Sequence, residues 1–426
     1  MRAAPCHWLL GLGAVCAMAC GGCERAKTEE ATVTNGAKLR LVFKHQPMWG
    51  DPTILRDRLA AFERAHPEVV LATEVLPNAS EVLHQYFLTA LEAKSRDFDV
   101  FVTDVVWIPE FSHAGWIADV SDVFPPASLK QDFIEGAAQA VIVDGRTFAV
   151  PWYVDVGILY YRSDLVSAPP RTYDELVREA RAARQKDPSL AGFVWQGRQY
   201  EGLVCNAFES IWGHGGEVSK GGLVELDTPA ARAGLGFLRE LITNGTSPRS
   251  VTSSTEEETR RAFQEGHAVF MRNWPYAYTE LQKEGSPVRG KVGFTTLPTV
   301  SGAPGHGALG GWQLALNAQT PPEKRAIAID LIRHLTSLEA NVTFAIAYGR
   351  NPPRLAAYQD ARLVHEAPFI AQLFPAVSRA WPRPVTPYYN MMSDVLQSEF
   401  SAVVSGVRPA DVALPRAQKL IDRITR

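Results

Sequence analysis

The chain has 426 residues, of which 46% are hydrophobic, and a formal net charge of −3 at pH 7. This length can form two substantial cores, and the nearly balanced charge without a basic block argues against nucleic acid as a partner. No Walker-type phosphate loop is present, which argues against ATP hydrolysis by this chain. No Cys/His spacing suggests a metal site, and no feature of the sequence implies a cofactor.

The N-terminal residues predict export. Arg2 and His7 form a short basic region, and residues 8–19 form an apolar stretch that is too short to cross a bilayer. We therefore interpret residues 1–19 as a signal peptide that is cleaved.

Small residues precede Cys20, which predicts a lipoprotein whose mature chain begins at that cysteine. Cys23 is a second candidate, and an ordinary secreted protein is the alternative. Acylation would hold the protein at a membrane surface, because each buried lipid methylene contributes about 0.8 kcal/mol. Residues 20–38 have no apolar period and are predicted to form a flexible tether.

Cys205 is the only cysteine outside the N-terminal region. A disulfide within the folded body is therefore excluded. Because Cys205 lies in an apolar run, we expect a small buried side chain.

Alternating strands and helices follow the tether, which predicts an α/β sheet. Asp51 and Pro52 supply the N-cap and first turn of the first helix. Asp104 follows an apolar strand, and the carboxyl ends of strands in such sheets bind ligands; a cap for a helix over 105–113 is a compatible alternative role. The remaining predicted elements are strands over 40–44, 69–75 and 98–102 and a helix over 82–93.

A Gly turn and a proline at 143–151 predict a crossing into a second core. Thr172 and Glu175 have the spacing of a capping box that opens a helix. A helix over 256–264 and a strand over 268–272 follow in this second lobe.

The Gly/Pro-rich residues 301–307 predict a second crossing, after which a capping box at Thr320 opens a helix that returns to the first lobe. Residues 351–354 predict a third crossing, with the C-terminal helices on the second lobe. Pro415 is expected to delay the start of the last helix. We therefore predict a first lobe of residues 39–148 and 302–350 and a second lobe of residues 149–301 and 351–426.

Residues 150–162 place aromatic rings and a carboxylate on an extended segment that begins with proline. A carboxylate such as Asp155 accepts short hydrogen bonds from paired hydroxyls, and a flat ring such as that of Tyr153 covers the apolar face of a pyranose. This combination indicates a sugar site.

Five segments resemble, in order, those of the extracellular solute-binding proteins of sugar ABC importers, nearest the trehalose/maltose-binding type. The resemblance implies a two-lobed periplasmic-binding-protein fold of type II, with hinge crossings and a ligand cleft between two α/β lobes. Closure of such lobes around a ligand is a known hinge motion. The five segments are residues 102–107, 150–162, 192–205, 272–278 and 310–312.

The resemblance also implies the ligand-binding residues. Asp155 would accept sugar hydroxyls, Arg354 would donate as a planar fork, and tryptophan and tyrosine rings would wall the sugar. Asp104, Trp107, Gly311 and Trp312 are expected from the first lobe, and Tyr153, Asp155, Trp274, Tyr276 and Arg354 from the second lobe and the hinges.

Two regions depart from the trehalose/maltose pattern, which has a carboxylate after the first strand and an arginine in the second helix. Here these regions are residues 45–51 and 81–85, where Asp51 is needed as a cap and no arginine occurs. One end of the site is therefore expected to be rebuilt around Gln46, Trp49, His84 or Gln85.

The expected protein is a monomeric, exported and lipid-anchored substrate-binding component of an ABC importer, which delivers an α-linked disaccharide to the transmembrane permease subunits without converting it. Two other classes are compatible with the sequence. A secreted glycosidase could use Asp104 and Asp155 from opposite cleft walls. A sensor or adaptor could present the bound sugar to a receptor.

Overall fold

The computed structural model describes residues 38–77, 79–220 and 223–425. The predicted signal peptide, tether and Cys20 anchor lie outside these residues, apart from Lys38. In the described ranges, no helix is both long and apolar enough to span a bilayer.

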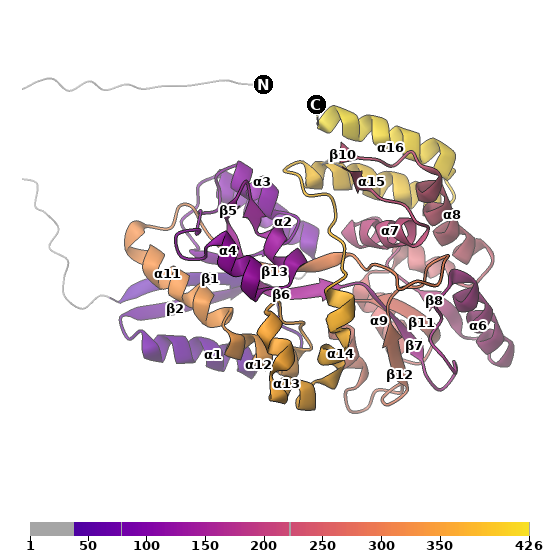
Figure 1. Cartoon of the computed structure of the whole chain (residues 1–426), viewed down its shortest axis with the longest axis horizontal. Helices are drawn as coiled ribbons and strands as arrows, with labels where there is room; N and C mark the ends of the chain where they lie inside the picture. The colour runs from indigo at the N-terminus through magenta and orange to yellow at the C-terminus, as the bar shows by residue number, and fades with distance from the viewer. Residues whose placement is uncertain (1–37, 78, 221–222, 426) are drawn as a thin grey trace, which may run out of the picture. The chain divides into compact units, whose positions relative to one another are not determined.

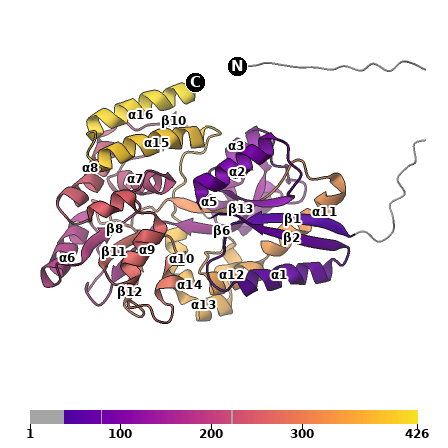
Figure 2. The ribbon, with the colours of Figure 1, turned by 180° about the vertical axis from the view of Figure 1, so that it is seen from behind.

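Two sheets organise these residues, and Figures 1 and 2 show helices covering both. The first sheet has the order β2-β1-β3-β13-β6, and the second has the order β12-β7-β11-β8. The first comprises β1 (Leu39–His45), β2 (Val69–Val75), β3 (Val100–Asp104), β6 (Ala149–Val156) and β13 (Leu309–Leu316). The second comprises β7 (Ile158–Arg162), β8 (Ala191–Val194), β11 (Ala268–Asn273) and β12 (Val292–Thr295). Two short pairs are β4 (Ile142–Val143) with β5 (Arg146–Thr147) and β9 (Ser219–Lys220) with β10 (Leu223–Val224).

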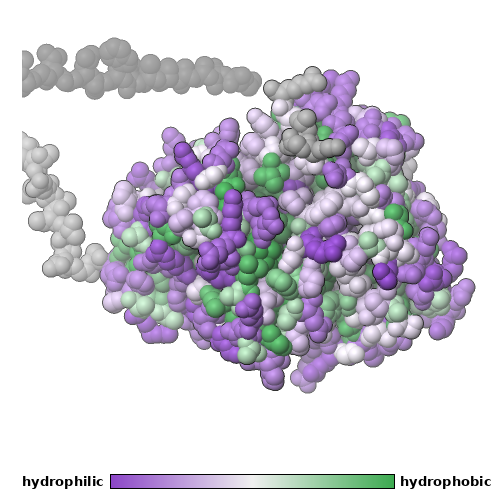
Figure 3. Space-filling view, in the orientation of Figure 1, coloured by the Kyte–Doolittle hydropathy of each residue, from purple (hydrophilic) through white to green (hydrophobic). Residues whose placement is uncertain are grey.

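The helices divide between the two sheets. Those around the first sheet are α1 (Pro52–Ala65), α2 (Ser80–Glu92), α3 (Ile108–His113), α4 (Pro126–Asp132), α5 (Glu135–Ala140), α11 (Pro322–Leu335), α12 (Leu338–Tyr348), α13 (Ala361–Glu366) and α14 (Pro368–Val377), with the 3-10 helix η2 (Leu355–Gln359). Those around the second are α6 (Tyr173–Lys186), α7 (Glu201–Gly213), α8 (Pro229–Thr243), α9 (Glu256–Gln264), α10 (Tyr276–Leu281), α15 (Tyr389–Val404) and α16 (Ala410–Ile424), with the 3-10 helix η1 (Arg249–Ser253). Polar side chains cover most of the face in Figure 3, and apolar side chains are exposed in its middle.

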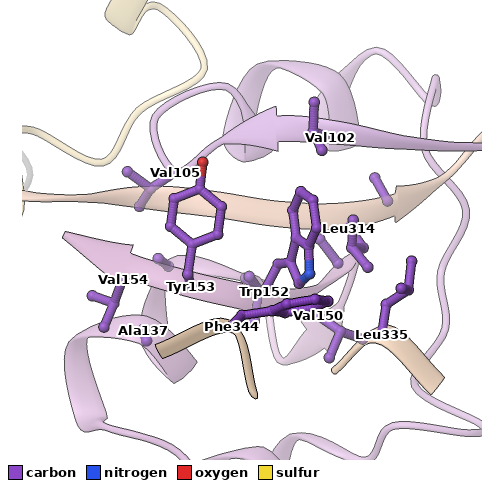
Figure 4. Packing of buried hydrophobic residues seen from close by; sticks show 14 of the residues in the cluster. Val102, Val105, Ala137, Val150, Trp152, Tyr153, Val154, Leu314, Leu335 and Phe344 are labelled. Carbon is purple, nitrogen blue, oxygen red and sulfur yellow. The ribbon is translucent and has the colours of Figure 1, made fainter. Parts of the chain in front are cut away.

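Each sheet is packed against its helices by buried apolar side chains. In the first, Trp152 packs edge-to-face on Phe344 of α12 with ring centroids 6.0 Å apart (Figure 4). In the second, Cys205 is 2% exposed, as the apolar run around it predicts. Among the strands of the first sheet that run parallel, β1 and β3 are mostly buried, whereas β2 lies at the edge of the sheet and is largely exposed.

Two helix starts confirm the predicted capping. The Asp51 carboxylate accepts a hydrogen bond from the Thr53 amide (2.9 Å), with Pro52 in the first turn of α1. Thr172 and Glu175 form the reciprocal capping box at the start of α6. Local side-chain geometry thus fixed both boundaries.

Three local predictions were wrong. Helix α11 begins at Pro322 without a side-chain cap, because the Thr320 hydroxyl donates to the Asp99 carbonyl instead (3.4 Å). Helix α16 begins at Ala410 and contains Pro415 inside it. Asp104 does not cap α3, which begins at Ile108; its carboxylate accepts from the Val106 amide (3.2 Å) in the preceding turn.

The division between the lobes differs from the predicted one. Strand β6 pairs along its length with β13, so residues 149–156 belong to the first sheet and the chain crosses at Gly157. Helix α13 packs on α12 of the first lobe, whereas α14 contacts β6 of the first sheet and, through Phe369, the Tyr278 and Phe294 rings of the second lobe. The second core takes up the C-terminal chain from about Met392. The third crossing is therefore near Trp381 rather than at 351–354.

The crossings lie side by side at the waist between the two sheets. The Gly157 amide donates to the Ala308 carbonyl (3.4 Å), and the Trp381 amide donates to the Gly307 carbonyl (3.0 Å). A Cβ on Gly307 would lie 2.2 Å from the Gly157 carbonyl oxygen, and one on Gly157 would lie 1.9 Å from Glu209 Oε1. Only glycine fits at these two points of close approach.

We expect Gly157→Ala to destabilise the protein by about 1–3 kcal/mol, because the added methyl group overlaps the buried Glu209 carboxylate. Gly236→Ala in α8 is the matched control, since a Cβ there meets open space; it should be neutral or stabilising by up to about 1 kcal/mol. Urea unfolding midpoints measure both. Equal midpoints for the Gly157 variant and the wild type would contradict the close packing of the waist.

Candidate functional site

A polar row runs across one face of the first sheet. Trp312 on β13 is paired with Asp104 on β3 and with Tyr153 on β6. Residues opposite one another in antiparallel strands point to the same face, so these three side chains are neighbours. Asp155, two residues beyond Tyr153, lies on the same face opposite Gly310. The structure thus brings four predicted residues together, all from the first sheet; Tyr153 and Asp155 had been expected from the second lobe and the hinges.

The two glycines of β13 shape this row. Gly311 has φ +121°, and a Cβ there would lie 2.4 Å from the Tyr153 carbonyl oxygen. Gly310 leaves room for the ring of Trp274, whose Cζ3 would lie 3.3 Å from a Cβ at that position. The missing side chains therefore let an aromatic ring from the second lobe approach Asp155.

Aromatic side chains surround the row on both sides. Trp107 packs edge-to-face on Trp312, with centroids 5.5 Å apart. Tyr276 of α10 stacks against Trp49, with centroids 6.5 Å apart and an interplanar angle of 20°. The structure brings Trp49, expected in the rebuilt end of the site, to a ring of the second lobe.

Two acidic residues of α9 hold the aromatic side chains of the second lobe. The Trp274 indole N–H donates to Glu256 (3.2 Å), and the Tyr276 hydroxyl donates to Glu257 (2.7 Å). Both rings are thereby fixed at their polar ends.

Arg350 lies in the middle of the cluster, although the sequence reasoning did not identify it. Its Nη1 is 3.6 Å from Asp155 Oδ2, and its guanidinium carbon is 4.5 Å from the centre of the Tyr153 ring and 5.4 Å from that of Tyr276. The chain turns into this position at Gly349, the left-handed end of α12. The sequence signal that could have identified Arg350 is the glycine directly before it, which ends a helix.

The predicted Arg354 lies elsewhere. Its Nε donates to the Thr336 carbonyl (2.8 Å), its Nη1 is 3.5 Å from Asp132, and its guanidinium packs 4.4 Å from the centre of the Phe133 ring. The structure does not bring Arg354 to the polar row, and Arg350 lies where a planar donor was expected.

Several buried polar atoms of the cluster lack a hydrogen-bond partner within the described part of the chain. These are Asp155 Oδ1, Arg350 Nε and Gln46 Oε1, whose residues are 7%, 6% and 1% exposed. Gln46 uses its amide N–H to donate to the Tyr153 hydroxyl. Each buried group left without a partner costs about 1–3 kcal/mol, so this site can supply hydrogen bonds to a solute.

Of the two other candidates for the rebuilt end, His84 reaches the cluster only through Trp107, and Gln85 contacts its own helix. The His84 ring contacts Trp107, with centroids 5.2 Å apart, and hydrogen-bonds to Glu110 (2.8 Å). The Gln85 side chain donates to Thr89 within its own helix (3.3 Å) and is exposed on α2.

Both carboxylates of the polar row lie beside an arginine. Burial raises the pKa of Asp155, and the neighbouring Arg350 guanidinium opposes this rise. Burial likewise raises the pKa of Asp104, against the guanidinium of Arg383 3.2 Å away. Asp155 lies beside Arg350, and Arg383 is shared between Asp104 and Glu201. The two carboxylates of the row are thus held next to arginines and can accept hydrogen bonds from the hydroxyl groups of a solute.

Another buried ion pair, between Arg272 and Glu209, lies next to the site. Arg272 donates through Nε to Glu209 Oε2 (2.8 Å) and pairs through Nη2 with Glu209 Oε1, and the Ala308 amide donates to the same Oε1 (2.9 Å). The Arg272 guanidinium also lies 4.0 Å from the centre of the Trp274 ring. The pair therefore connects the waist to the aromatic wall.

We expect Arg272→Met to lower stability by about 3–5 kcal/mol, because Glu209 would remain buried without its counter-charge. The double variant Arg272→Met/Glu209→Leu should recover part of this loss. Arg178→Met is the control, because its ion pair with Glu179 is exposed and should leave the urea midpoint unchanged. An equally small effect at Arg272 would contradict a structural role for the buried pair.

Comparison with known proteins identifies the class. Residues 49–342 match the family model described as bacterial extracellular solute-binding protein. A Deinococcus radiodurans protein described as a "Probable ABC transporter-binding protein" is 36% identical over 364 residues, which are 82% of this chain and 85% of that protein. The chain belongs to the bacterial extracellular solute-binding protein family. The members of this family are exported; they bind solutes and are not enzymes.

Solved structures show the same two-lobed fold of type II. The maltose-bound T. maritima protein MalE3 has a TM-score of 0.84 and 36% identity, and the match covers 91% of this chain and 100% of that one. The GacH receptor of Streptomyces glaucescens has a TM-score of 0.80 at 20% identity, covering 91% of this chain and 98% of that one, which supports the fold alone.

Proposed function

We propose that this protein is the substrate-binding component of an ABC sugar importer and that it captures an α-linked disaccharide of the maltose or trehalose type between its two lobes. The observation that carries the proposal is the buried Asp155–Arg350 pair, which keeps an acceptor and a donor atom without partners beside aromatic rings from both lobes. The 36% identity to a maltose-bound protein supports the same substrate class.

The chemistry of a disaccharide matches these groups. Asp155 Oδ1 accepts from one hydroxyl while Arg350 Nε donates to another, which satisfies both atoms at once. The rings of Trp312 and Trp274 provide apolar surface for the C–H faces of the sugar rings. Because the ligand contacts residues of both lobes, binding stabilises the closed arrangement over an open one.

The arrangement of the carboxylates argues against the glycosidase alternative. Asp104 and Asp155 lie on one sheet, separated by β13, and not on opposite walls. Each also has an arginine as its partner rather than a second carboxyl group. The carboxylates thus act as hydrogen-bond acceptors for the sugar. Delivery to permease subunits, rather than presentation to a sensory receptor, is favoured by the relative described as an ABC transporter-binding protein.

The proposed function is tested by titrating maltose and trehalose into the protein in a calorimeter and analysing the recovered sugar. We expect one sugar to bind per protein and to be recovered unchanged. In parallel, a sugar at about 100 times its dissociation constant should stabilise the fold by about 2.7 kcal/mol. Turnover of either sugar, or the absence of binding to any α-linked disaccharide, would refute the proposal.

Substitutions in the site should weaken binding without unfolding the protein. Asp155→Ala and Arg350→Met each remove one partner of the sugar, and Trp312→Ala removes an apolar wall, so each should cost about 2–3 kcal/mol, or about 30- to 150-fold in affinity. Arg354→Met is the matched control and should keep its affinity within about twofold of the wild type while lowering the melting temperature. If Arg354→Met loses affinity and Arg350→Met does not, the assignment of the donor is wrong.

We also propose that the exported protein is anchored to the membrane by a lipid on Cys20, based on the small residues before that cysteine. Detergent partitioning of the native protein measures this. We expect Cys20→Ala to abolish partitioning into the detergent phase or to block processing, whereas Cys23→Ala should do neither. A soluble native protein cleaved after Cys23 would contradict the anchor.

A further inference from the structure

The segment between α14 and α15 carries Arg383, which is 4% exposed and contacts carboxylates attached to both sheets. Its Nη2 donates to Asp104 Oδ1 at the end of β3 (3.2 Å), and its Nη1 donates to Glu201 Oε1 at the start of α7 (2.7 Å). Asp104 belongs to the first lobe and α7 to the second. One guanidinium therefore bridges the two lobes beside the ligand site.

Glu201 is held in place by further contacts. The Tyr389 hydroxyl donates to Glu201 Oε1 (2.6 Å), and the Ser393 hydroxyl donates to Oε2, both from α15. The backbone amide of Glu201 donates to Glu81 Oε1 of α2 in the first lobe (3.0 Å). Since the side chain of Tyr200, the N-cap residue of α7, makes no hydrogen bond to the first turn of that helix, the Glu81 carboxylate acts as the cap of α7 from the opposite lobe.

A neighbouring contact follows the same pattern. Asn390 of α15 donates to Glu110 of α3 and lies 3.0 Å from His84 Nε2 of α2. The start of α15 and the start of α7 thus both meet the first lobe through polar side chains. Polar contacts of this kind can be exchanged for water when two surfaces part, unlike the apolar contacts of a core.

We infer that Arg383 is a positioning residue that couples ligand recognition to lobe closure: it orients the Asp104 carboxylate toward the ligand and latches Asp104 to Glu201 in the closed form. The inference rests on the proposed function, because it takes Asp104 to be a ligand contact. The described contacts of the Asp104 carboxylate, from Arg383 and the Val106 amide, both fall on Oδ1 and leave Oδ2 for the ligand.

The latch has a kinetic consequence. Parting of the lobes separates the guanidinium from at least one of its two carboxylates, so the bridge stabilises the closed form and not the open one. Encounter with the sugar takes place in the open form, whereas escape requires opening. Loss of the bridge should therefore speed dissociation and leave association nearly unchanged. A brace that only stabilised the fold would lower the melting temperature without this difference between the two rates.

The test measures association and dissociation of maltose by stopped-flow tryptophan fluorescence for the wild type, Arg383→Met, Arg383→Lys and Arg408→Met. Arg408 is the matched control, because its ion pair with Glu399 (2.6 Å) lies within the second lobe alone. We expect Arg383→Met to raise the dissociation rate at least about tenfold with association within about threefold of the wild type, and Arg383→Lys to fall between them. Arg408→Met should leave both rates within about twofold while lowering the melting temperature.

Two outcomes separate failure of the latch from failure of the proposed function. An unchanged dissociation rate in an Arg383→Met protein that binds maltose would overturn the latch alone. Absence of maltose binding to the wild type would count against the proposed function. In that case the radius of gyration of the sugar-free protein in solution tests whether Arg383 holds the lobes together. It should be larger for Arg383→Met than for the wild type, and equal values would overturn the latch.

Discussion

The ion pair between Arg272 and Glu209 is the interaction on which the rest of the structure depends. It connects the last part of β11 to the middle of α7, and Glu209 also holds the amide of Ala308 where the chain crosses back to the first sheet. Glycine at position 157 is required because the carboxylate fills the space beside it. A charge pair in this place is expensive to bury, but it fixes the relative position of two segments more narrowly than apolar packing would. The same guanidinium then supports the ring of Trp274, so the geometry of the waist determines the geometry of the site.

The site itself contains polar atoms that the protein leaves without partners. Asp155, Arg350 and Gln46 are almost fully buried, yet each has one polar atom to which no described residue hydrogen-bonds. A fold selected only for stability would satisfy or remove such atoms. A solute-binding protein gains from them, because a sugar that supplies the missing hydrogen bonds is favoured over one that does not. The unpaired atoms therefore lower the stability of the empty protein and, for the same reason, make it selective for a ligand that supplies their hydrogen bonds.

Much of the fold could be predicted from the sequence. The features that could not be predicted depend on contacts between residues far apart in the chain. Helix caps such as Asp51 and Thr172 were predictable because their partners are two or three residues away. The placement of β6 was not, because a buried strand of either sheet has the same apolar pattern, and only its pairing with β13 decides. The family could be inferred from the order of its motifs. The finer assignment of residues depended on contacts between distant parts of the chain.

The candidate site shows the same limit. Asp104 was predicted from its place at a strand end, and Trp312 from the Gly-Gly-Trp run that resembles the family. The structure places the two residues opposite each other on β3 and β13. The choice between Arg350 and Arg354 was not visible, since the two arginines flank the same Asn-Pro-Pro run and only the folded chain shows that Arg350 lies beside Asp155. Arg383 carried no motif, and its partners are 182 and 279 residues away.

Under the proposed function, a sugar lies beside the unpaired atoms of Asp155 and Arg350. A crystal structure of the protein grown with maltose tests this most directly. We expect sugar density between Trp312 and Trp274, with one hydroxyl within hydrogen-bond distance of Asp155 Oδ1 and another within hydrogen-bond distance of Arg350 Nε. Maltose bound elsewhere, with ordered water or protein groups satisfying both atoms, would contradict it.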